Sequence, residues 1–589
     1  MKTLSFAVIR AILLPALSGT ALAQSAKPAP PPPATLRVGL WTLWHDKEIT
    51  VSPGREAYAM LRFCQSCAPT RLPQPTRITA SGARLSLPGN RQAVSIWLTG
   101  PVILAAHGET LALSNPLRIA ARSGELVLSA TLPLENYVER VVASESGPAD
   151  TPESLKALAI VVRSFALHQP HGHADYDLCD STHCQLLRWS GNPERKNAAH
   201  AAALATASET LWFHGQRAQA WFHQNCGGRT ASPTEVWPAL KQGREPVSKP
   251  MPWLVSRIDN YCTSAGAREW SAELSLSDLT GALAAQKLAR PGWKNLTVAR
   301  RGESGRAVTL LADSTEISAE EFRLAVGRAL GWNKILSTWF EVARQGDRFL
   351  FHGRGSGHGV GLCQAGAAAM AALGRDSSQI LAQYFPGAIA ADEATGRPWQ
   401  RYPGEGFQLE TLDAADAGWL RQLSQALAEA ESRSGLQPAN PITIRALRST
   451  PAFRDAALAP GWVAAFTEGE WIATQPLATL ASRKLLVPIL RHEFLHALVE
   501  SQAAPNTPLW FREGLVEDWA DGKRSGPPPT LNLDRIDRAL ARATSEAQAR
   551  AAHRAAAWYA GRLLDRFGRA QVLVWLRSGL PLSAMAALN

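Results

Sequence analysis

The hydrophobic pattern of the chain changes from short alternating runs to a helical period between residues 131 and 151. From Thr35 to about Thr131, apolar and polar residues alternate in runs such as LRVGLWTL and TRITASGARLSL, with Gly, Ser and Asn between the runs. Alternation with a period of two is typical of half-buried strands, and the intervening residues favour turns. The sequence therefore predicts a small antiparallel sheet region that is followed by a helical segment.

The stretch TPESLKALAIVVRSFALH, residues 151–168, predicts the first long helix. Thr151 can cap its amino end, and Pro152 suits the first helical position, where a backbone N–H is not needed. Apolar side chains at helical spacing form one face, at Leu155, Leu158, Ala159 and Val162. A second, alanine-rich helix is expected over residues 194–210.

The chain is too long for one compact core, because its 589 residues exceed the usual size of a single domain. The sequence changes to ADEATGRPWQRYPGEG over residues 391–406, a composition that is typical of a domain boundary. We expect an α+β fold, with a mixed domain containing antiparallel β regions over residues 35–390 and a linker over residues 391–408. A mainly helical domain, rich in Ala, Leu and Arg, is expected over residues 409–589.

The chain begins MKTLSFAVIRAILLPALSGTALAQ, which has the pattern of a secretory signal peptide. Lys2 and Arg10 precede a short apolar stretch, and small residues lead to a cleavage point after Ala23. Residues 1–23 are therefore predicted to be removed, and residues 24–34 form a Pro-rich linker. No later segment has the roughly 18 continuous apolar residues of a membrane span. We expect a mature chain without a transmembrane span, secreted or periplasmic and associated with the cell wall.

The positive charge of the chain is compatible with an anionic or wall-associated polymer as partner. The formal charge is +11 over the whole sequence, and two of the positive charges belong to the predicted signal peptide. Nucleic acid is a poor fit, because export separates the protein from it and no basic run interleaved with aromatic residues is present. Charge alone does not identify the polymer.

Five blocks of sequence occur in a fixed order between residues 134 and 371: LENYVERVVASESG, TPESLKALAIVVRSFAL, YDLCDSTHCQ, WFHQNCGGRT and GRGSGHGVGLCQAGAAAMA. Together they resemble the SpoIID/LytB family of bacterial cell-wall proteins, across about residues 35–390. The resemblance implies a SpoIID-like domain with peptidoglycan glycan strands as ligand. In the sporulation branch it implies lytic transglycosylase activity, and the catalytic acid of that branch corresponds to Glu145.

A single carboxyl group at Glu145 is chemically sufficient for this reaction. Cleavage of a glycosidic bond needs a proton on the leaving oxygen, which a carboxylic acid shielded from water can deliver near neutral pH. A hydrolase usually adds a second carboxylate, whereas a lytic transglycosylase uses the 6-hydroxyl of the muramic acid as nucleophile. Arg163 either binds the acid group of the sugar or forms a structural ion pair. His358, in the glycine-rich block, is predicted to line the cleft.

The stretch YDLCDSTHCQ places Cys179, His183 and Cys184 close together, and His173 precedes Cys179 by six residues. Two thiolates and two imidazoles would complete the tetrahedral shell of a structural zinc ion, and members of the SpoIID/LytB family can hold zinc near this block. The alternative is a Cys179–Cys184 disulfide, which suits an exported protein. The seven cysteines do not decide, because pairing Cys64 with Cys67 and Cys226 with Cys262 leaves only Cys363 over.

The stretch LLVPILRHEFLHALVES contains the pattern HExxH, with His492 and His496 four residues apart. On a helix this spacing directs both imidazoles toward one ion, and Glu493 can face a metal-bound water. The following stretch WFREGLVEDWA resembles the gluzincin peptidases, which implies Glu513 as third zinc ligand and Glu517 as a partner of a ligand histidine. The resemblance covers about residues 480–580. It implies a zincin-like domain that hydrolyses a peptide substrate.

The sequence therefore predicts an exported peptidoglycan-remodelling protein with two units. The first cleaves glycan strands as a lytic transglycosylase through Glu145, and the second is a zinc peptidase-like domain. The alternative for the first unit is a non-catalytic module that binds peptidoglycan and stimulates a separate cell-wall amidase, as the LytB branch is thought to do. A third reading makes the peptidase the sole enzyme.

Overall fold

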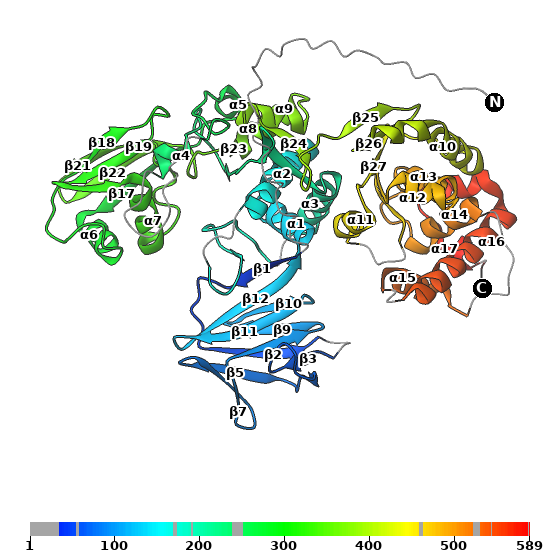
Figure 1. Ribbon diagram of the computed structural model, residues 1–589, viewed down its shortest axis with the longest axis horizontal. Helices are drawn as coiled ribbons and strands as arrows, with labels where there is room; N and C mark the ends of the chain where they lie inside the picture. The colour runs from blue at the N-terminus through cyan, green and yellow to red at the C-terminus, as the bar shows by residue number, and fades with distance from the viewer. Residues whose placement is uncertain are drawn as a thin grey trace, which may run out of the picture.

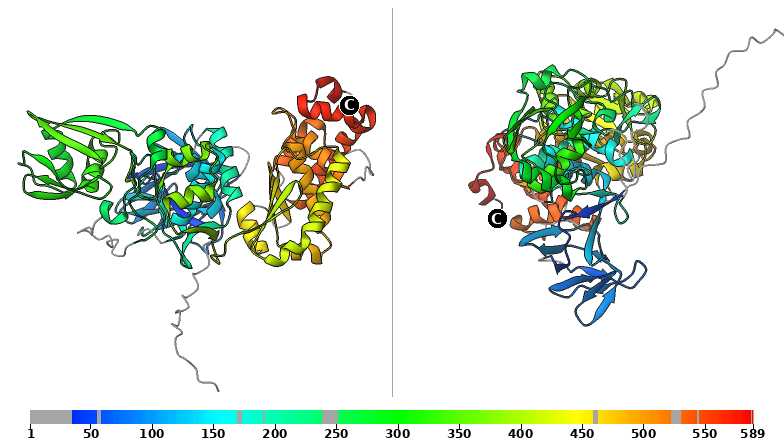
Figure 2. Two further views of the ribbon diagram at one scale, coloured as in Figure 1. Left: turned by 90° about the horizontal axis from the view of Figure 1, so that it is seen from above. Right: turned by 90° about the vertical axis from the view of Figure 1, so that its left-hand side faces the viewer.

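The computed structural model describes residues 35–54, 58–168, 173–189, 192–237, 251–458, 463–521, 530–542, 545–586 and 588. The predicted signal peptide and Pro-rich linker lie outside these residues. The described chain has an α+β fold with about 39% helix and several antiparallel sheets, as the sequence predicts. In two views a helical centre lies between an N-terminal β region, a lobe formed by residues 269–354 and a C-terminal part (Figures 1 and 2). Among the described residues, no helix is long and apolar enough to cross a membrane.

The N-terminal β region, whose strands the alternating sequence predicts, consists of two sheets. The first sheet has the order β13-β1-β12-β11-β8-β3-β4, and its strands are β1 (Thr35–Leu40), β3 (Met60–Arg62), β4 (Thr70–Arg71), β8 (Ser95–Thr99), β11 (Leu117–Arg122), β12 (Glu125–Pro133) and β13 (Leu178–Cys179). The second has the order β10-β9-β2-β5-β6-β7, and its strands are β2 (Glu48–Pro53), β5 (Thr76–Ser81), β6 (Arg84–Leu87), β7 (Arg91–Ala93), β9 (Val102–Ala106) and β10 (Glu109–Leu113). Of the two disulfide pairings that the sequence left open, Cys64–Cys67 is present in this region, whereas Cys226 and Cys262 are free thiols.

The helical centre is built around α2 (Pro152–His168), the helix that the sequence predicts most clearly. Pro152 is its first residue, and almost every residue from Ser154 to Leu167 is buried. The expectation of a single apolar face was therefore too narrow. Helices α1 (Leu134–Glu145), α3 (Pro193–Ala205) and α8 (Gln364–Ala372) and strand β14 (Glu209–Phe213) all contact α2, so it is enclosed on several sides.

Short elements complete the centre. They are β15 (Gln216–Arg217), β16 (Phe222–His223), α4 (Pro233–Val236), α5 (Asn260–Ser264), β23 (Leu362–Cys363), α9 (Ser377–Tyr384) and β24 (Ile389–Asp392). Strand β16 pairs in parallel with β23, and β14 pairs antiparallel with both β15 and β24. These pairings bring the glycine-rich block next to segments more than one hundred residues earlier in the chain.

A separate lobe is inserted between β16 and β23, which the sequence did not predict. It has two three-stranded antiparallel sheets and a hydrophobic core of its own. Its elements are β17 (Glu269–Ser275), α6 (Leu276–Ala285), β18 (Leu296–Arg301), β19 (Ala307–Ala312), β20 (Thr315–Ser318), α7 (Ala319–Leu330), β21 (Phe340–Gln345) and β22 (Arg348–Arg354). It stands apart from the N-terminal sheets in Figure 1.

The C-terminal part contains a five-stranded mixed sheet, so the expectation of a mainly helical domain was incomplete. The sheet has the order β25-β26-β27-β29-β28, and its strands are β25 (Gln400–Pro403), β26 (Phe407–Thr411), β27 (Ile442–Ala446), β28 (Ala465–Glu468) and β29 (Trp471–Thr474). Each strand has only four or five residues, too few for a clear period within an Ala- and Leu-rich sequence.

Helices cover this sheet. They are η1 (Ala414–Trp419), α10 (Leu420–Ser434), α11 (Thr450–Ala457), α12 (Leu477–Ser482), α13 (Leu486–Glu500), α14 (Leu509–Asp521), α15 (Leu533–Arg542), α16 (Glu546–Ser578) and α17 (Leu582–Ala586). The HExxH sequence lies on α13, and the segment with Glu513 lies on α14, as the sequence predicts.

Residues 391–408, predicted as a linker, take part in sheets on both sides of the domain boundary. Strand β24 pairs with β14 of the centre, and β25 pairs with β26 of the C-terminal sheet. Arg445 of β27 crosses the boundary and bonds Glu209 and Glu410, each at 2.6 Å, with its side chain only 4% exposed. The helical centre and the C-terminal part therefore contact each other through this buried ion pair. A hydrophobic cluster with residues from both parts lies beside it.

Candidate functional site

Glu145 is the last residue of α1 and is half-buried. Burial raises the pKa of its carboxyl to about 7, and the Leu186 amide and the charge of Arg188 oppose this rise. A carboxyl with such a pKa is partly protonated near neutral pH, so it can donate a proton and afterwards accept one. The position therefore has the electrostatic property that the predicted catalytic acid requires.

Two segments that are distant in sequence fix the end of α1 around Glu145. The backbone N–H of Leu186 donates to Glu145 Oε1 at 3.2 Å, and that of Arg188 donates to Ser144 Oγ at 2.7 Å. From the glycine-rich block, the Gln364 side chain donates to the Glu145 carbonyl at 3.0 Å. The carboxyl is thus held by the loop that follows Cys184, and its backbone is held by the start of α8.

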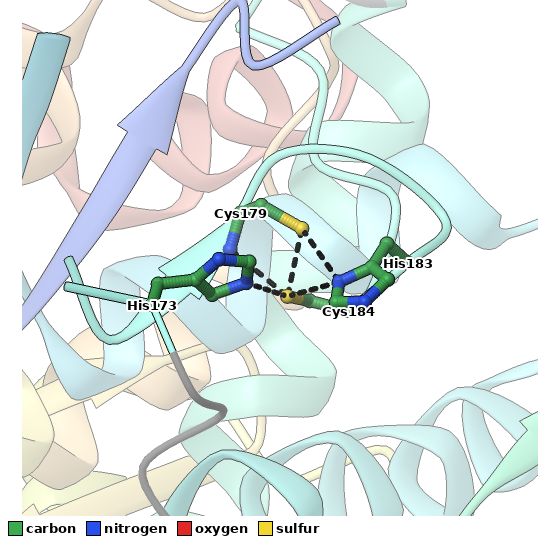
Figure 3. Close-up of side chains that lie close together, drawn as sticks. All are labelled: His173, Cys179, His183 and Cys184. Atoms are coloured by element: carbon green, nitrogen blue, oxygen red, sulfur yellow. Dashed lines mark hydrogen bonds between the residues drawn. The ribbon is translucent and has the colours of Figure 1, made fainter. Parts of the chain in front are cut away.

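The four predicted zinc ligands lie together in the loop that precedes Leu186 (Figure 3). Cys179 Sγ is 2.7 Å from Cys184 Sγ, His173 Nε2 is 3.4 Å from Cys184 Sγ, and His183 Nδ1 is 3.7 Å from each sulfur. Both cysteines are thiols, and the distance between their sulfurs exceeds the roughly 2.04 Å of a disulfide bond. Two thiols and two imidazoles are the donor types of a structural zinc ion. The 2.7 Å between the two sulfurs is shorter than the roughly 3.7 Å of a tetrahedral shell, so zinc binding would require the sulfurs to move apart.

Arg163 does not face a ligand, so its predicted role in substrate binding was wrong. Its side chain is fully buried within α2 and forms two hydrogen bonds with the Glu135 carboxylate, at 2.9 and 2.6 Å. It also donates to the carbonyls of Glu209 and Ala203. All of these partners belong to the protein interior. Arg163 therefore forms a structural ion pair, which is the alternative that the sequence left open.

The glycine-rich block brings its backbone close to the segment 221–227. A side chain at Gly361 would place its Cβ 2.1 Å from the Trp221 carbonyl, and one at Gly355 would lie 2.9 Å from the Asn225 carbonyl. Both glycines have positive φ, at +75° and +80°. These glycines therefore allow two backbone segments to approach each other closely.

His358 of this block is half-buried and lies between aromatic rings. Its ring centroid is 5.2 Å from that of Trp237 and 5.6 Å from that of His223, and its Nδ1 accepts the N–H of Val360. Desolvation lowers the pKa of His358 well below its usual value, so the ring is neutral. Its predicted place at a substrate cleft stays a prediction.

In the C-terminal part, α13 and α14 bring the predicted zinc ligands together. His492 Nε2 is 3.1 Å from His496 Nε2, and Glu513 Oε2 is 3.8 Å from His496 Nε2. Glu513 Oε2 is buried and has no hydrogen-bond partner among the described residues. The His553 imidazole lies 3.5 Å from this oxygen and can offset its charge. Two imidazoles and a carboxylate are donor types that zinc binds.

The three ligands and Glu493 line a cavity of about 1660 Å³. Strand β28, an edge strand of the sheet, forms part of its wall, and Thr467 of β28 donates to Glu493 Oε2 at 2.6 Å. An exposed strand edge is a common binding surface for an extended peptide. The cavity thus combines room for a ligand with a backbone edge and a carboxylate beside the imidazoles.

Sequence analysis missed His553, which lies on α16 across from Glu513 and Glu517. Its Nδ1 is 3.0 Å from Glu517 Oε1 and 3.5 Å from Glu513 Oε2. Gly514 permits this approach, because a Cβ there would lie 2.3 Å from the Ala556 carbonyl of α16. Glu517 therefore pairs with His553, which is not one of the ligand histidines that the resemblance implied. A single histidine in an alanine-rich helix gave no sequence signal for this contact.

Comparison with known proteins shows what the central segment is similar to. Residues 122–213 match the SpoIID family, described as stage II sporulation protein. Glu145 and the cysteine–histidine loop lie within the matched residues. Residues 258–361, which include the inserted lobe, match a domain of unknown function, DUF8618.

Individual relatives carry the corresponding names. Stage II sporulation protein D of Bacillus subtilis is 28% identical over 306 residues, which cover 48% of this chain and 81% of that protein. An uncharacterized protein of Brachyspira hyodysenteriae is 26% identical over 315 residues, 52% of this chain and 80% of its own length. The amidase enhancer of Bacillus subtilis is 22% identical over 290 residues, 42% of this chain and 39% of that protein.

Proposed function

We propose that the chain is an exported, wall-associated protein whose SpoIID domain cleaves peptidoglycan glycan strands as a lytic transglycosylase. The observation that carries the proposal is Glu145, a half-buried carboxyl with a pKa of about 7. It lies in the segment that matches the SpoIID family, and the resemblance to the sporulation branch implies that it is the catalytic acid. The test is cleavage of purified, peptide-stripped glycan by the full chain and by variants of Glu145.

In the proposed reaction Glu145 acts first as acid and then as base. Its proton passes to the bridging oxygen as the glycosidic bond breaks. The carboxylate then takes the proton from the 6-hydroxyl of the same muramic acid, whose oxygen closes onto the anomeric carbon. The product has a 1,6-anhydro end, and Glu145 is protonated again. The Leu186 N–H, directed at Oε1, stabilises the carboxylate between these two steps.

The rate of glycan cleavage should fall as the pH rises through about 7. The first step needs protonated Glu145, and the raised pKa means that the acid form predominates below about 7 and is lost above it. The expected profile of kcat/KM is level on the acid side and declines about tenfold per pH unit on the alkaline side. A profile that declines only below pH 5 would contradict the assignment of the acid.

We further propose that His173, Cys179, His183 and Cys184 hold a structural zinc ion. The ion would fix the loop whose Leu186 amide, two residues after Cys184, contacts Glu145. Substitution of Cys184 by Ser should therefore remove one zinc equivalent per chain. It should also lower cleavage on the order of 10–100-fold, because the carboxyl loses its positioned partner.

The measurement is zinc content by mass spectrometry together with turnover on glycan. Thr182→Ala is the matched control, since Thr182 is exposed in the same loop and should leave both values unchanged. Full zinc content in Cys184→Ser would exclude this site. A Cys179–Cys184 disulfide in the purified chain would support the alternative that the sequence left open.

For the C-terminal part we propose a second activity, the hydrolysis of peptides. His492, His496 and Glu513 would hold zinc, which supplies a Lewis acid and lowers the pKa of a bound water. Glu493 is placed beside the imidazoles to accept a proton, and Thr467 orients its carboxylate. The edge of β28 offers an extended peptide a strand to pair with. The 1660 Å³ cavity favours this activity over a closed structural site.

Peptide cleavage by the full chain should be sensitive to chelators and should fall about 10²–10⁴-fold in Glu493→Gln, which retains the size of the side chain but accepts no proton. Cleavage of a mixed peptide library, analysed by mass spectrometry, measures it. Glu405→Gln is the control, because Glu405 is exposed in the same part of the chain. Equal cleavage by wild type and Glu493→Gln would mean that the HExxH site is not the peptidase centre.

A second candidate function for the SpoIID domain is the binding of glycan without cleavage. One relative is named amidase enhancer, and a domain that binds glycan without cutting it would also need a fixed loop and cleft. In that case the chain would retain glycan and accelerate a separate cell-wall amidase. Assay of an added amidase with and without the Glu145→Gln variant separates the two, because enhancement would not depend on proton transfer.

A further inference from the structure

A second group of metal-ligating side chains lies outside the site described above. Cys226, Asp259, Cys262 and Cys363 are all buried, and one ligand atom from each lies within 4.8 Å of the others. Cys226 Sγ is 3.3 Å from Asp259 Oδ2. The ligand atoms of a tetrahedral zinc ion are separated by about 3–4 Å, since Zn–S is about 2.3 Å and Zn–O about 2.0–2.2 Å. The cluster therefore has the dimensions of one four-coordinate site.

The four residues lie where the chain enters and leaves the inserted lobe. Cys226 follows β16, Asp259 and Cys262 belong to the start and first turn of α5, and Cys363 ends β23. Residues 258–361, the segment that matches DUF8618, run from α5 through the lobe to β23. A metal ion bound by these four residues would therefore join the helical centre to both segments that connect it with the lobe.

The backbone around Cys226 is folded so that amides point at sulfur atoms. Gly227 and Gly228 have φ of +76° and +104°, and the N–H of Gly228 donates to Cys226 Sγ at 3.3 Å. The N–H of Cys226 donates to Cys363 Sγ at 3.2 Å. Hydrogen bonds of this kind fix the position of a sulfur ligand.

The aspartate has a supporting partner of the kind that metal-bound carboxylates usually have. The Tyr384 hydroxyl donates to Asp259 Oδ2 at 2.9 Å. Gly366 leaves room for this contact, because a Cβ there would lie 2.1 Å from the Tyr384 hydroxyl and 2.6 Å from Asp259 Oδ2. Hydrogen bonds of this type orient a ligand and raise metal affinity.

A buried cation next to the cluster indicates that the cluster carries negative charge. Arg306 is 1% exposed, and its guanidinium donates to the carbonyls of Cys226, at 2.8 Å, and Gly357, at 3.3 Å. Carbonyl oxygens do not neutralise a buried guanidinium, so a nearby anionic centre is needed to offset its desolvation. Three thiolates and a carboxylate exceed the charge of one divalent ion and would supply that centre.

We propose that Cys226, Cys262, Cys363 and Asp259 bind one Zn²⁺ ion, which clamps the inserted lobe to the helical centre. Three soft thiolates select zinc over calcium or magnesium. The shell is closed by four protein ligands, which is typical of a structural site. A disulfide would use only two of the three thiols, and all three are thiols in this structure. Binding releases the thiol protons to solvent.

The test uses the full chain, purified with zinc under reducing, oxygen-free conditions. Cys226→Ser combined with Cys363→Ser should carry one zinc equivalent per chain less than wild type, measured by inductively coupled plasma mass spectrometry. Cys64→Ser combined with Cys67→Ser is the control, because it removes two cysteines elsewhere and should keep the wild-type zinc content. Equal zinc in wild type and the Cys226/Cys363 variant would overturn the proposal. A disulfide between any two of the three cysteines, in wild type purified without reductant, would also overturn it.

A milder variant keeps the test valid if the double variant does not fold. Tyr384→Phe removes the hydrogen bond to Asp259 and leaves all four ligands in place. Competition with a coloured chelator should then show zinc affinity at one site reduced by about 10–100-fold. Wild-type affinity at every site in Tyr384→Phe would contradict the role assigned to Asp259 and overturn the proposed ligand set.

Discussion

Substitution of Glu145 by Gln is expected to reduce cleavage of peptide-stripped glycan by about 10²–10⁴-fold. The amide has almost the volume of the carboxyl, and its oxygen can still accept the Leu186 N–H, so the loop should stay in place. What the variant lacks is a proton to give to the leaving oxygen. The measurement is the initial rate of new chain ends on purified glycan, with the full chain at fixed concentration.

Glu139→Gln is the matched control for this prediction. Glu139 is also a half-buried glutamate of α1, but it pairs with His200 at 3.2 Å and lies at a different part of the helix surface. Its variant should cleave glycan within a factor of a few of wild type. A Glu145→Gln variant that folds normally and cleaves at the wild-type rate would remove the basis of the proposed mechanism.

Substitution of Arg163 by Met is expected to destabilise the helical centre by about 3–5 kcal/mol, the largest effect on stability that we anticipate. The side chain is fully buried, and the change leaves the Glu135 carboxylate, which is 8% exposed, without its cation. The Glu209 and Ala203 carbonyls also lose a donor. Urea unfolding followed by circular dichroism measures the change.

The double variant Glu135→Leu with Arg163→Met separates the ion pair from the shape of the side chains. Replacing both buried charges by apolar groups of similar size should restore much of the lost stability. Arg77→Ala, which breaks an exposed pair with Glu48, should leave stability almost unchanged. If Arg163→Met were as stable as wild type and only weakened glycan binding, the side chain would be a ligand-binding residue after all.

Local patterns in the sequence predicted the elements whose contacts are local. Helix α2 begins at Pro152, and the N-terminal strands follow the alternating runs, because period and capping are properties of neighbouring residues. The strands of the C-terminal sheet were missed because they are too short to show a period. The inserted lobe was missed because nothing in its sequence marks where the fold of the centre is interrupted.

The difference between local and long-range contacts also explains which site residues could be predicted. His173, Cys179, His183 and Cys184 lie within one short loop, so their assembly is visible in the sequence. Cys226 and Cys363 are 137 residues apart, and only the parallel pairing of β16 with β23 brings them together. Arg163 was misassigned for a related reason. A helical arginine near a candidate acid looks the same in sequence whether it faces a ligand or the core.

The identity of the chain ends that the wild-type protein generates tests the central claim most directly. Peptide-stripped glycan is incubated with the full chain, and the products are analysed by mass spectrometry. We expect new muramic acid ends in the 1,6-anhydro form, since the substrate's own hydroxyl replaces water in the reaction through Glu145. Ordinary reducing ends, or glycan that is bound but carries no new ends, would contradict the account.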